Sequence, residues 1–312
     1  MELLTFRRAF KCNYYTACFL CYRCCCFLLL ATSVVDVNAA SLQDAECGSL
    51  NEEQLLRQTD FAVPTEHQWL ARITYENGHE EKLPNDGCLG VLISKRNVLA
   101  PAHCFVQYDG QADAYSVQLG VWNKSSNAHE VVCDKDGYCV LPAQDIQLSE
   151  IAIHPEYDPL TLKNSLAVLR LQRDAKFSHN VMPICMPPLS LTNETLVGEM
   201  FVVAGLPIKD MFKHKTWVNT ISRPYCQKTH NSLITSSTTI CGYQDRMKTY
   251  YQGAPLVGIQ VQSDVPQNFY LVGLLMDSKE VAKKERIVSS FLDIRPYLSF
   301  INRNAEGLIV KS

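Results

Sequence analysis

Two short stretches contain the residues whose types could do chemistry. In "VLAPAHCF", His103 follows a strand-like run and stands directly before Cys104. In "TYYQGAPLVG", a tight turn with Gly253 and Pro255 leads into an apolar strand, which is the outline of a loop that presents a nucleophile. The position before the glycine holds Gln252, and an amide is not a nucleophile. Whether the chain is an enzyme therefore depends on this loop.

The elements that must position these stretches are predicted to be β-strands. From residue 61 onward, short apolar or alternating runs are separated by turns, which is typical of antiparallel sheets. Representative runs are "CLGVLIS", "YSVQLGVW", "SLAVLRL" and "NFYLVGLLM". Near the end, "FLDIRPYLSFINRN" repeats apolar residues at three- and four-residue steps and predicts an amphipathic helix. An all-β body of this size with a terminal helix indicates two barrels or sandwiches in tandem.

The composition is that of an ordinary globular protein. The chain has 312 residues, of which 47% are hydrophobic and 20% are charged. A net charge of -3 gives no general reason to expect nucleic acid as a partner. The 8 histidines show no zinc-ligand spacing, so neither a metal nor another cofactor is expected.

Residues 1–39 have the layout of a secretory signal peptide. Arg7, Arg8 and Lys11 precede an apolar run, and "VNAA" offers small residues for cleavage. The alternative is an uncleaved membrane anchor, but the longest apolar run without a charge, from Cys24 to Val35, is short for a membrane span. No later segment looks transmembrane. The sequence therefore predicts an extracellular protein with no membrane span in its mature form.

Cysteine usage supports secretion. Six of the 14 cysteines lie in the leader, which leaves eight. An even number in a secreted chain predicts a disulfide framework, although spacing does not choose among about 105 possible pairings. The sequons at Asn123 and Asn193 predict glycosylation where they are exposed.

From about Leu56 to Asn304, the chain resembles a chymotrypsin-type serine protease domain. The run "GCLGVLIS…VLAPAHC" resembles the segment with the catalytic histidine, and "HPEYDPLTLKNSLAVLRL" resembles the segment with the acid. "VMPICMP", "PYCQ…TTICGY", "QGAPLVG" and "FLDIRPYLSFI" continue the series in order. The resemblance implies an all-β fold of two antiparallel six-stranded β-barrels with a C-terminal α-helix, over residues 56–312. Residues 40–55 would form an N-terminal segment tethered by Cys47.

The resemblance also implies four disulfides. One of them, in "VVCDKDGYCV", resembles an extra loop disulfide of the arthropod clip-domain proteases and points to that branch of the family. No clip domain is recognisable in the segment before Leu55, which contains a single cysteine after the leader. The implied pairs are Cys88–Cys104, Cys133–Cys139, Cys226–Cys241 and Cys47–Cys185.

The family's catalytic positions correspond to His103, Ser165 and Gln252. The histidine is present, but Ser165 stands where the family usually has aspartate, and Gln252 stands where it has the serine. Loss of the nucleophile alone costs about six orders of magnitude in turnover in a well-studied serine protease. The chain is therefore predicted to be a pseudoprotease and not an enzyme. His103 is expected to remain as a packing and hydrogen-bonding residue.

The positions around the triad differ from the family as well. Tyr250 replaces the oxyanion glycine, and Tyr251 replaces the aspartate that pairs with the new terminus on activation. That terminus would lie at Leu56-Arg57, and the floor of the specificity pocket at about Arg246. We expect the two tyrosines to close the pocket. The usual substrate edge corresponds to Met276, Asp277 and Ser278.

These losses imply a function through binding. Non-catalytic relatives of clip-domain proteases act as cofactors or regulators in extracellular protease cascades, including melanisation and humoral immunity in insects. The expected partners are extracellular serine proteases, their zymogens or their substrates. The alternative is recognition of microbial or matrix polyanions by two basic stretches. These stretches contain Lys209, Lys213, His214 and Lys215, and Lys279, Lys283, Lys284 and Arg286.

Overall fold

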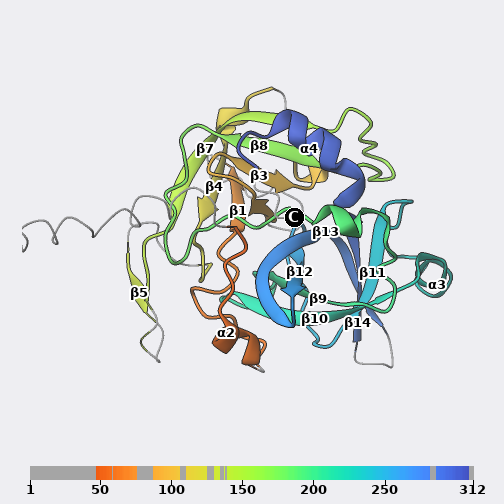
Figure 1. Ribbon diagram of the computed structural model, residues 1–312. Helices are drawn as coiled ribbons and strands as arrows, with labels where there is room; N and C mark the ends of the chain where they lie inside the picture. Colours follow the sequence, from red (N-terminus) through yellow and green to blue (C-terminus); the bar gives the residue numbers. More distant parts are fainter. Residues whose placement is uncertain are drawn as a thin grey trace, which may run out of the picture. The chain divides into compact units, whose positions relative to one another are not determined.

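Two closed β-barrels of six strands each make up the fold (Figure 1). The computed structural model describes residues 47–57, 59–75, 87–105, 110–124, 130–133, 137, 139–281 and 286–308. The predicted leader, residues 1–39, lies outside the described residues, as do Lys283 and Lys284. In the part of the chain that is described, no helix is long and apolar enough to cross a membrane.

The first barrel contains the segment with His103. Its strands pair antiparallel in the order β1-β2-β3-β8-β7-β4. They are β1 (Leu70–Tyr75), β2 (Cys88–Leu92), β3 (Asn97–Ala100), β4 (Tyr115–Leu119), β7 (Gln144–Ile153) and β8 (Ala167–Leu171). A separate two-stranded sheet is formed by β5 (Val132–Cys133) and β6 (Cys139–Val140).

The second barrel contains the loop with Gln252. Its strands pair antiparallel in the order β10-β11-β14-β13-β12-β9. They are β9 (Met200–Gly205), β10 (His214–Ile221), β11 (Thr239–Gln244), β12 (Pro255–Gln262), β13 (Val265–Val281) and β14 (Arg286–Asp293). The prediction of two six-stranded barrels is therefore confirmed.

Burial along the strands follows the apolar runs of the sequence. Strand β10 alternates between buried and more exposed residues, as expected for a strand with one face toward the core and one toward solvent. In β2 and β3 every residue is buried, so both faces of these strands are covered. This explains why "CLGVL" reads as a continuous apolar run and not as an alternation.

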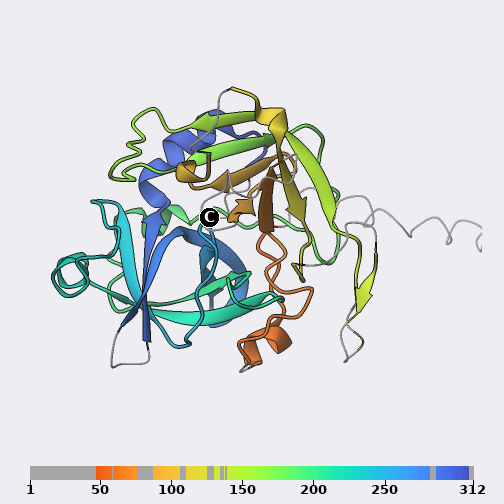
Figure 2. The same cartoon turned by 180° about the vertical axis from the view of Figure 1, so that it is seen from behind.

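The predicted C-terminal helix is present but short. It is α4 (Leu298–Asn304), preceded by the 3₁₀ turn η6 (Arg295–Tyr297). Phe300 and Ile301 of α4 pack into the hydrophobic cluster of the first barrel, and the reverse view shows the helix beside that barrel (Figure 2). Two more short helices, α2 (Glu52–Leu56) and α3 (Arg223–Thr229), lie outside the barrels' strands.

Four disulfides join the eight described cysteines in the pairs that the resemblance implies. Cys88–Cys104 links β2 to the turn that carries His103, and Cys133–Cys139 joins the two strands of the small sheet. Cys226–Cys241 links α3 to β11. Cys47–Cys185 ties the N-terminal segment to the crossing between the barrels, over a sequence separation of 138 residues.

The loop before β12 passes through a narrow gap between the two barrels. The backbone N–H of Leu89 in β2 donates to the carbonyl of Gln252 at 2.7 Å, and the N–H of Gly253 donates to the carbonyl of Leu275 in β13 at 2.8 Å. Gly253 has a φ of 86°, and a Cβ added there would lie 1.8 Å from the carbonyl oxygen of Leu89. Only glycine meets both conditions, because it accepts positive φ and brings no side-chain atom.

We expect Gly253→Ala to destabilise the protein far more than Gly307→Ala. Gly307 also has a positive φ, of 69°, but a Cβ there would meet no atom within 4 Å. Gly307→Ala should lower the free energy of unfolding by about 1 kcal/mol, the usual cost of left-handed backbone. Gly253→Ala should lower it by about 3 kcal/mol or more, because two barrels must also move apart. Chemical denaturation of both variants measures the difference, and equal losses would contradict the close approach.

Candidate functional site: the degenerate triad

The three triad positions come together at the junction of the barrels. His103 lies in the 3₁₀ turn η3 (Ala102–Phe105), which follows β3 and is held to β2 by the Cys88–Cys104 disulfide. Ser165 lies just before β8 and is fully buried. Gln252 lies in the loop before β12. The sequence therefore identified three residues that the fold does bring into contact.

Ser165 is aimed at His103 by the residue before it. Asn164 has a φ of 54°, a conformation that asparagine tolerates better than most residues. Its side chain donates to the carbonyl of Glu156 at 2.9 Å and accepts from the hydroxyl of Tyr297 at 2.9 Å. This turn is thus fixed on both sides, and the following serine points inward.

A continuous chain of hydrogen bonds links the three positions. The backbone N–H of His103 donates to Ser165 Oγ at 3.1 Å, and the same Oγ lies 2.9 Å from His103 Nδ1. On the other side of the ring, His103 Nε2 lies 2.9 Å from Gln252 Oε1. The Gln252 amide nitrogen donates to the backbone carbonyl of Met276 at 3.0 Å.

The direction of the hydrogen bonds in this series is fixed at the Gln252 end. Because the amide nitrogen of Gln252 donates to the Met276 carbonyl, its oxygen faces His103 and needs a donor, which is Nε2–H. His103 Nδ1 is then an acceptor, and the hydroxyl of Ser165 donates a hydrogen bond to it. In a working triad, Nδ1–H donates to the acid and Nε2 accepts from the nucleophile. The imidazole here therefore has the opposite tautomer.

Burial keeps this imidazole neutral. The side chain is 4% exposed. Burial lowers the pKa of His103 to about 4, against smaller opposing effects from the hydrogen bond to Gln252 and the charge of Asp277. A ring with its proton on Nε2 and such a low pKa does not take up a proton from a group on the Gln252 side near neutral pH.

The substrate-edge positions lie on β13. Pairing of β13 with β14 shifts between Leu275 and Asp277, so Met276 is the extra residue of a β-bulge, and a bulged residue leaves the ladder. Its carbonyl is the one that Gln252 occupies. Asp277 accepts from the N–H of Ile234 and pairs with Lys279 at 3.2 Å, while Ser278 Oγ lies 2.8 Å from Ser289 Oγ.

The tyrosine pair fills space beside the triad. Tyr250 is buried in a hydrophobic cluster of the second barrel, and this burial raises the pKa of its hydroxyl well above the usual value. Tyr251 is half-buried, with its ring 3.5 Å from the position of a Cβ on Gly87 and Lys124 Nζ 5.1 Å from its ring centre. Neither side chain is positioned as a nucleophile toward His103, whose Nε2 is taken by Gln252.

Arg246, the predicted floor of the specificity pocket, does not line a pocket with the triad residues. It is exposed in a bend after β11 and lines a different pocket, together with Arg57 and other residues of the N-terminal segment. Leu56, at the expected activation terminus, is the last residue of α2 and is exposed.

The first basic stretch, the candidate for polyanion recognition, does not present three of its four basic residues as a free basic surface. Lys213 is buried, and its Nζ donates to the backbone carbonyls of Pro64 and Glu66. His214 is buried beside Asp210, with 3.0 Å between Nε2 and Oδ2. Lys215 pairs with Glu66 at 2.5 Å. These side chains are structural groups held by partners from residues 60–66 and 210, and charge counting along a sequence does not show such contacts.

The sequons and the metal question remain at the level of prediction. Asn123 is half-exposed and forms an isolated bridge with Phe212, and Asn193 lies in the 3₁₀ turn η5 (Leu189–Asn193). Within the described ranges, no group of three or more His, Cys, Asp or Glu side chains is arranged to hold a metal ion.

Sequence reasoning missed the acceptor that orients Gln252. The Met276 carbonyl is a backbone group, so its role leaves no residue-type signal. No sequence signal marks it, because the bulge at Met276 becomes visible only in the pairing of β13 with β14.

Comparison with known proteins places this geometry in a family. The sequence model described as "Trypsin" matches residues 57–254. The chain is 28% identical over 291 residues to phenoloxidase-activating factor 3 of Holotrichia diomphalia, and the match covers 89% of this chain and 80% of that protein. It is 26% identical over 257 residues to melanization protease 1 of Drosophila melanogaster, covering 78% and 63%. It is 28% identical over 207 residues to CLIP domain-containing serine protease B9 of Anopheles gambiae, covering 62% and 51%.

Among solved structures, the Grass clip serine protease of the Drosophila Toll pathway superposes with a TM-score of 0.65. The sequence identity is 17%, and the match covers 84% of this chain and 75% of that chain. At this identity the likeness shows the fold alone. The chain spans 51% to 63% of the length of the B9 and melanization proteases.

The buried, neutral His103 should make stability depend on pH. Between about pH 6.5 and 4 the unfolded chain protonates this histidine while the native chain does not, so the stabilising contribution is present above pH 6.5 and is lost as pH falls toward 4. The loss from this residue is about 3 kcal/mol at most. Denaturation between pH 7 and 4 should therefore show a shallower decline for His103→Gln than for the unchanged protein.

Nitrogen NMR of the imidazole rings gives an independent check. His103 should be a neutral ring with its proton on Nε2 at pH 7 and should not titrate above pH 5. A proton on Nδ1 at pH 7 would show that the hydrogen-bond chain runs the other way. Parallel pH curves for the two proteins would show that burial does not lower the pKa of His103.

Proposed function

The chain belongs to the trypsin family, and we propose that it is a secreted, catalytically inactive homologue that acts as a cofactor or regulator in an extracellular protease cascade. The names of its relatives support the kind of cascade, because they include a phenoloxidase-activating factor and a melanization protease. A role in melanisation or a related humoral defence is the form of the proposal that fits these relatives best.

The observation that carries the proposal is the contact between His103 and Gln252. The position of the family's nucleophile holds an amide, and that amide is engaged on both sides, by His103 Nε2 and by the Met276 carbonyl. Serine protease chemistry needs a hydroxyl whose proton passes to an unprotonated Nε2, and a carboxylate that stabilises the resulting imidazolium. Here Nε2 carries the proton, and Ser165 supplies a neutral hydroxyl at the acid's position.

Binding is what such a domain can still do. A two-barrel scaffold holds its loops rigidly, and loops on rigid scaffolds carry recognition independently of any chemistry at the old site. Active proteases of the cascade, their zymogens and their substrates are the proposed partners. Secretion is supported by the four disulfides, which persist in oxidising compartments, and by the predicted leader at residues 1–39.

The proposal predicts no reaction with an active-site serine probe. A fluorophosphonate should not label the purified protein, because Gln252 offers no nucleophile. Gln252→Ser alone should leave turnover about 10⁴-fold or more below that of an active relative, because the carboxylate at position 165 is still absent. Peptide hydrolysis and probe labelling measure both effects, with an active clip-domain protease as the positive control. Labelling of the unchanged protein would refute the loss of catalysis.

The cascade role predicts a change in the rate of another enzyme. Adding the purified chain to an active clip-domain protease and its natural protein substrate should alter the rate of substrate cleavage, with saturation at high concentration. The same chain after reduction and alkylation, which removes its four disulfides, is the matched control and should have no effect. Unchanged cleavage rates, together with unchanged melanisation after depletion of the chain from the extracellular fluid, would contradict the proposal.

A further inference from the structure

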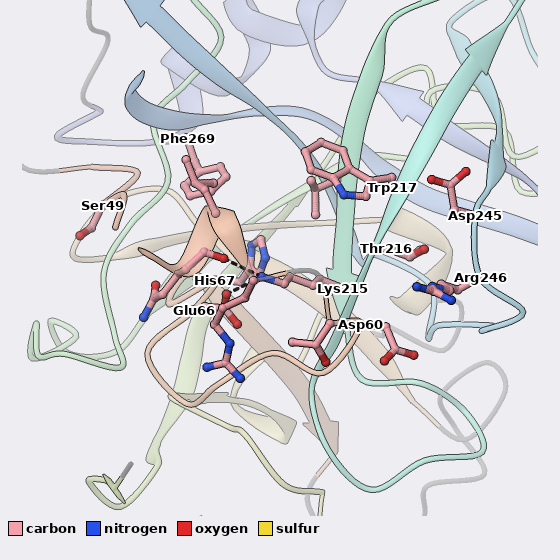
Figure 3. A pocket seen from close by; sticks show the side chains of 15 residues that line it. Ser49, Asp60, Glu66, His67, Lys215, Thr216, Trp217, Asp245, Arg246 and Phe269 are labelled. Atoms are coloured by element: carbon pink, nitrogen blue, oxygen red, sulfur yellow. Dashed lines mark hydrogen bonds and ion pairs between the residues drawn. The ribbon is translucent and has the colours of Figure 1, made fainter. Parts of the chain in front are cut away.

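A pocket on the second barrel that no triad residue lines has features of a ligand site. Its volume is about 370 Å³, which falls in the range of small-molecule sites. One wall comes from the N-terminal segment around α2, and the other comes from β10 and from residues after β11 (Figure 3). Neither His103 nor Gln252 lines it.

Part of the pocket is aromatic and aliphatic. Trp217 is 41% exposed and lies at one of the exposed positions of β10, between the buried Thr216 and Val218. Phe269 lies across from it, as Figure 3 shows, and Val202 and Leu55 add aliphatic surface. A ligand with a flat apolar body would cover Trp217 and remove that surface from water.

The base of the pocket contains a strained, buried histidine. His67 has a φ of 50° and is 6% exposed, and its Nδ1 has no hydrogen-bond partner among the described residues. Its ring packs against Trp69 and Phe269 at centroid distances of 5.4 and 5.7 Å. Strained backbone and unpaired buried polar atoms occur preferentially at functional sites. The fold therefore keeps an unfavourable residue at the base of this pocket.

The carboxylates that line the pocket are already engaged. Glu66 accepts from the Val63 N–H through Oε2 and from Lys215 through Oε1. Asp60 lies 3.8 Å from both Lys248 and His214. Asp245 accepts from the amide of Asn219 at 3.0 Å.

The two arginines of the pocket differ from the carboxylates. Neither Arg57 nor Arg246 has a hydrogen bond or an ion pair to any residue that the structure describes. The electrostatics at the base agree, because burial first, and then the charges of Lys213 and Lys215, lower the pKa of His67. The pocket therefore combines apolar walls with two arginines that no described carboxylate pairs.

We propose that this pocket binds a small organic anion, a carboxylate or sulfonate on an aromatic or aliphatic body, with Arg57 and Arg246 contacting the charge and Trp217 and Phe269 the body. The inference goes beyond the cascade role and does not rest on it, because no residue of the triad takes part. Since α2 forms one wall and β10 the other, the ligand also fastens the N-terminal segment to the second barrel.

The test compares two probes of one shape, 1-naphthaleneacetate and 1-naphthaleneacetamide, on the intact mature protein. Calorimetry should give a dissociation constant about 10-fold or more lower for the anion than for the neutral amide, because charge-assisted hydrogen bonds to guanidinium are the stronger kind. Arg57→Gln and Arg246→Gln should each raise the dissociation constant of the anion several-fold and leave that of the amide unchanged. Trp217→Ala should weaken both probes.

Arg303→Gln is the matched control, because Arg303 is an exposed arginine on α4 and does not line the pocket. It should change neither dissociation constant. Melting temperatures of the ligand-free variants show whether each one folds. Equal binding of the two probes, unchanged binding of the anion to the Arg57→Gln/Arg246→Gln double variant, or no binding of either probe at millimolar concentration would each overturn the proposal.

Discussion

The passage of residues 252 and 253 between the two barrels is the constraint on which the site depends. Leu89 of β2 binds the carbonyl of Gln252, Leu275 of β13 binds the N–H of Gly253, and no side chain fits at position 253. These contacts involve backbone atoms and a glycine, so they do not depend on which side chain stands at position 252. The backbone of a nucleophile loop therefore persists with a side chain that is not a nucleophile.

This constraint also explains why the triad positions stay in contact. Once the loop is fixed against β2, the side chain at position 252 points at the ring of His103, which η3 and the Cys88–Cys104 disulfide hold in place. An amide at that point has a donor and an acceptor, and it uses the acceptor on the histidine and the donor on the bulged Met276 carbonyl. All the polar groups are satisfied, and the direction of every hydrogen bond along the chain follows from this choice.

The sequence predicted the parts of this site that depend on patterns and missed those that depend on packing. Apolar runs located the strands, and the resemblance supplied the barrels, the four cysteine pairs and the positions of His103, Ser165 and Gln252. The tautomer of His103 could not be predicted, because it depends on a backbone carbonyl freed by a bulge in β13. The basic stretch before β10 was misjudged for a related reason. Whether a lysine such as Lys213 faces solvent or the protein interior depends on strand register and on what covers the strand.

Burial of Lys213 connects the N-terminal segment to the rest of the fold. An ammonium group without water is costly, and its burial lowers the pKa of Lys213 to about 7. The backbone carbonyls of Pro64 and Glu66 offset part of this cost, and Lys215 reaches the carbonyl of Gln54 at the same face. The residues ahead of β1 are thus held by buried charge as well as by the Cys47–Cys185 disulfide, and they form a permanent wall of the pocket.

The triad positions and the pocket beside α2 differ in how many of their polar groups lack a partner within the protein. We take this difference to indicate which of them binds a ligand. At the triad, the protein's own glutamine occupies the groups that would otherwise meet a substrate. In the pocket beside α2, two arginines, a half-exposed tryptophan and a strained histidine have no equivalent partner within the described chain. Affinity depends on preorganised groups and on electrostatic complementarity more than on buried area, and groups that already pair within the protein add little to it. The proposed anion site is therefore the pocket beside α2 and not the region of the three triad positions.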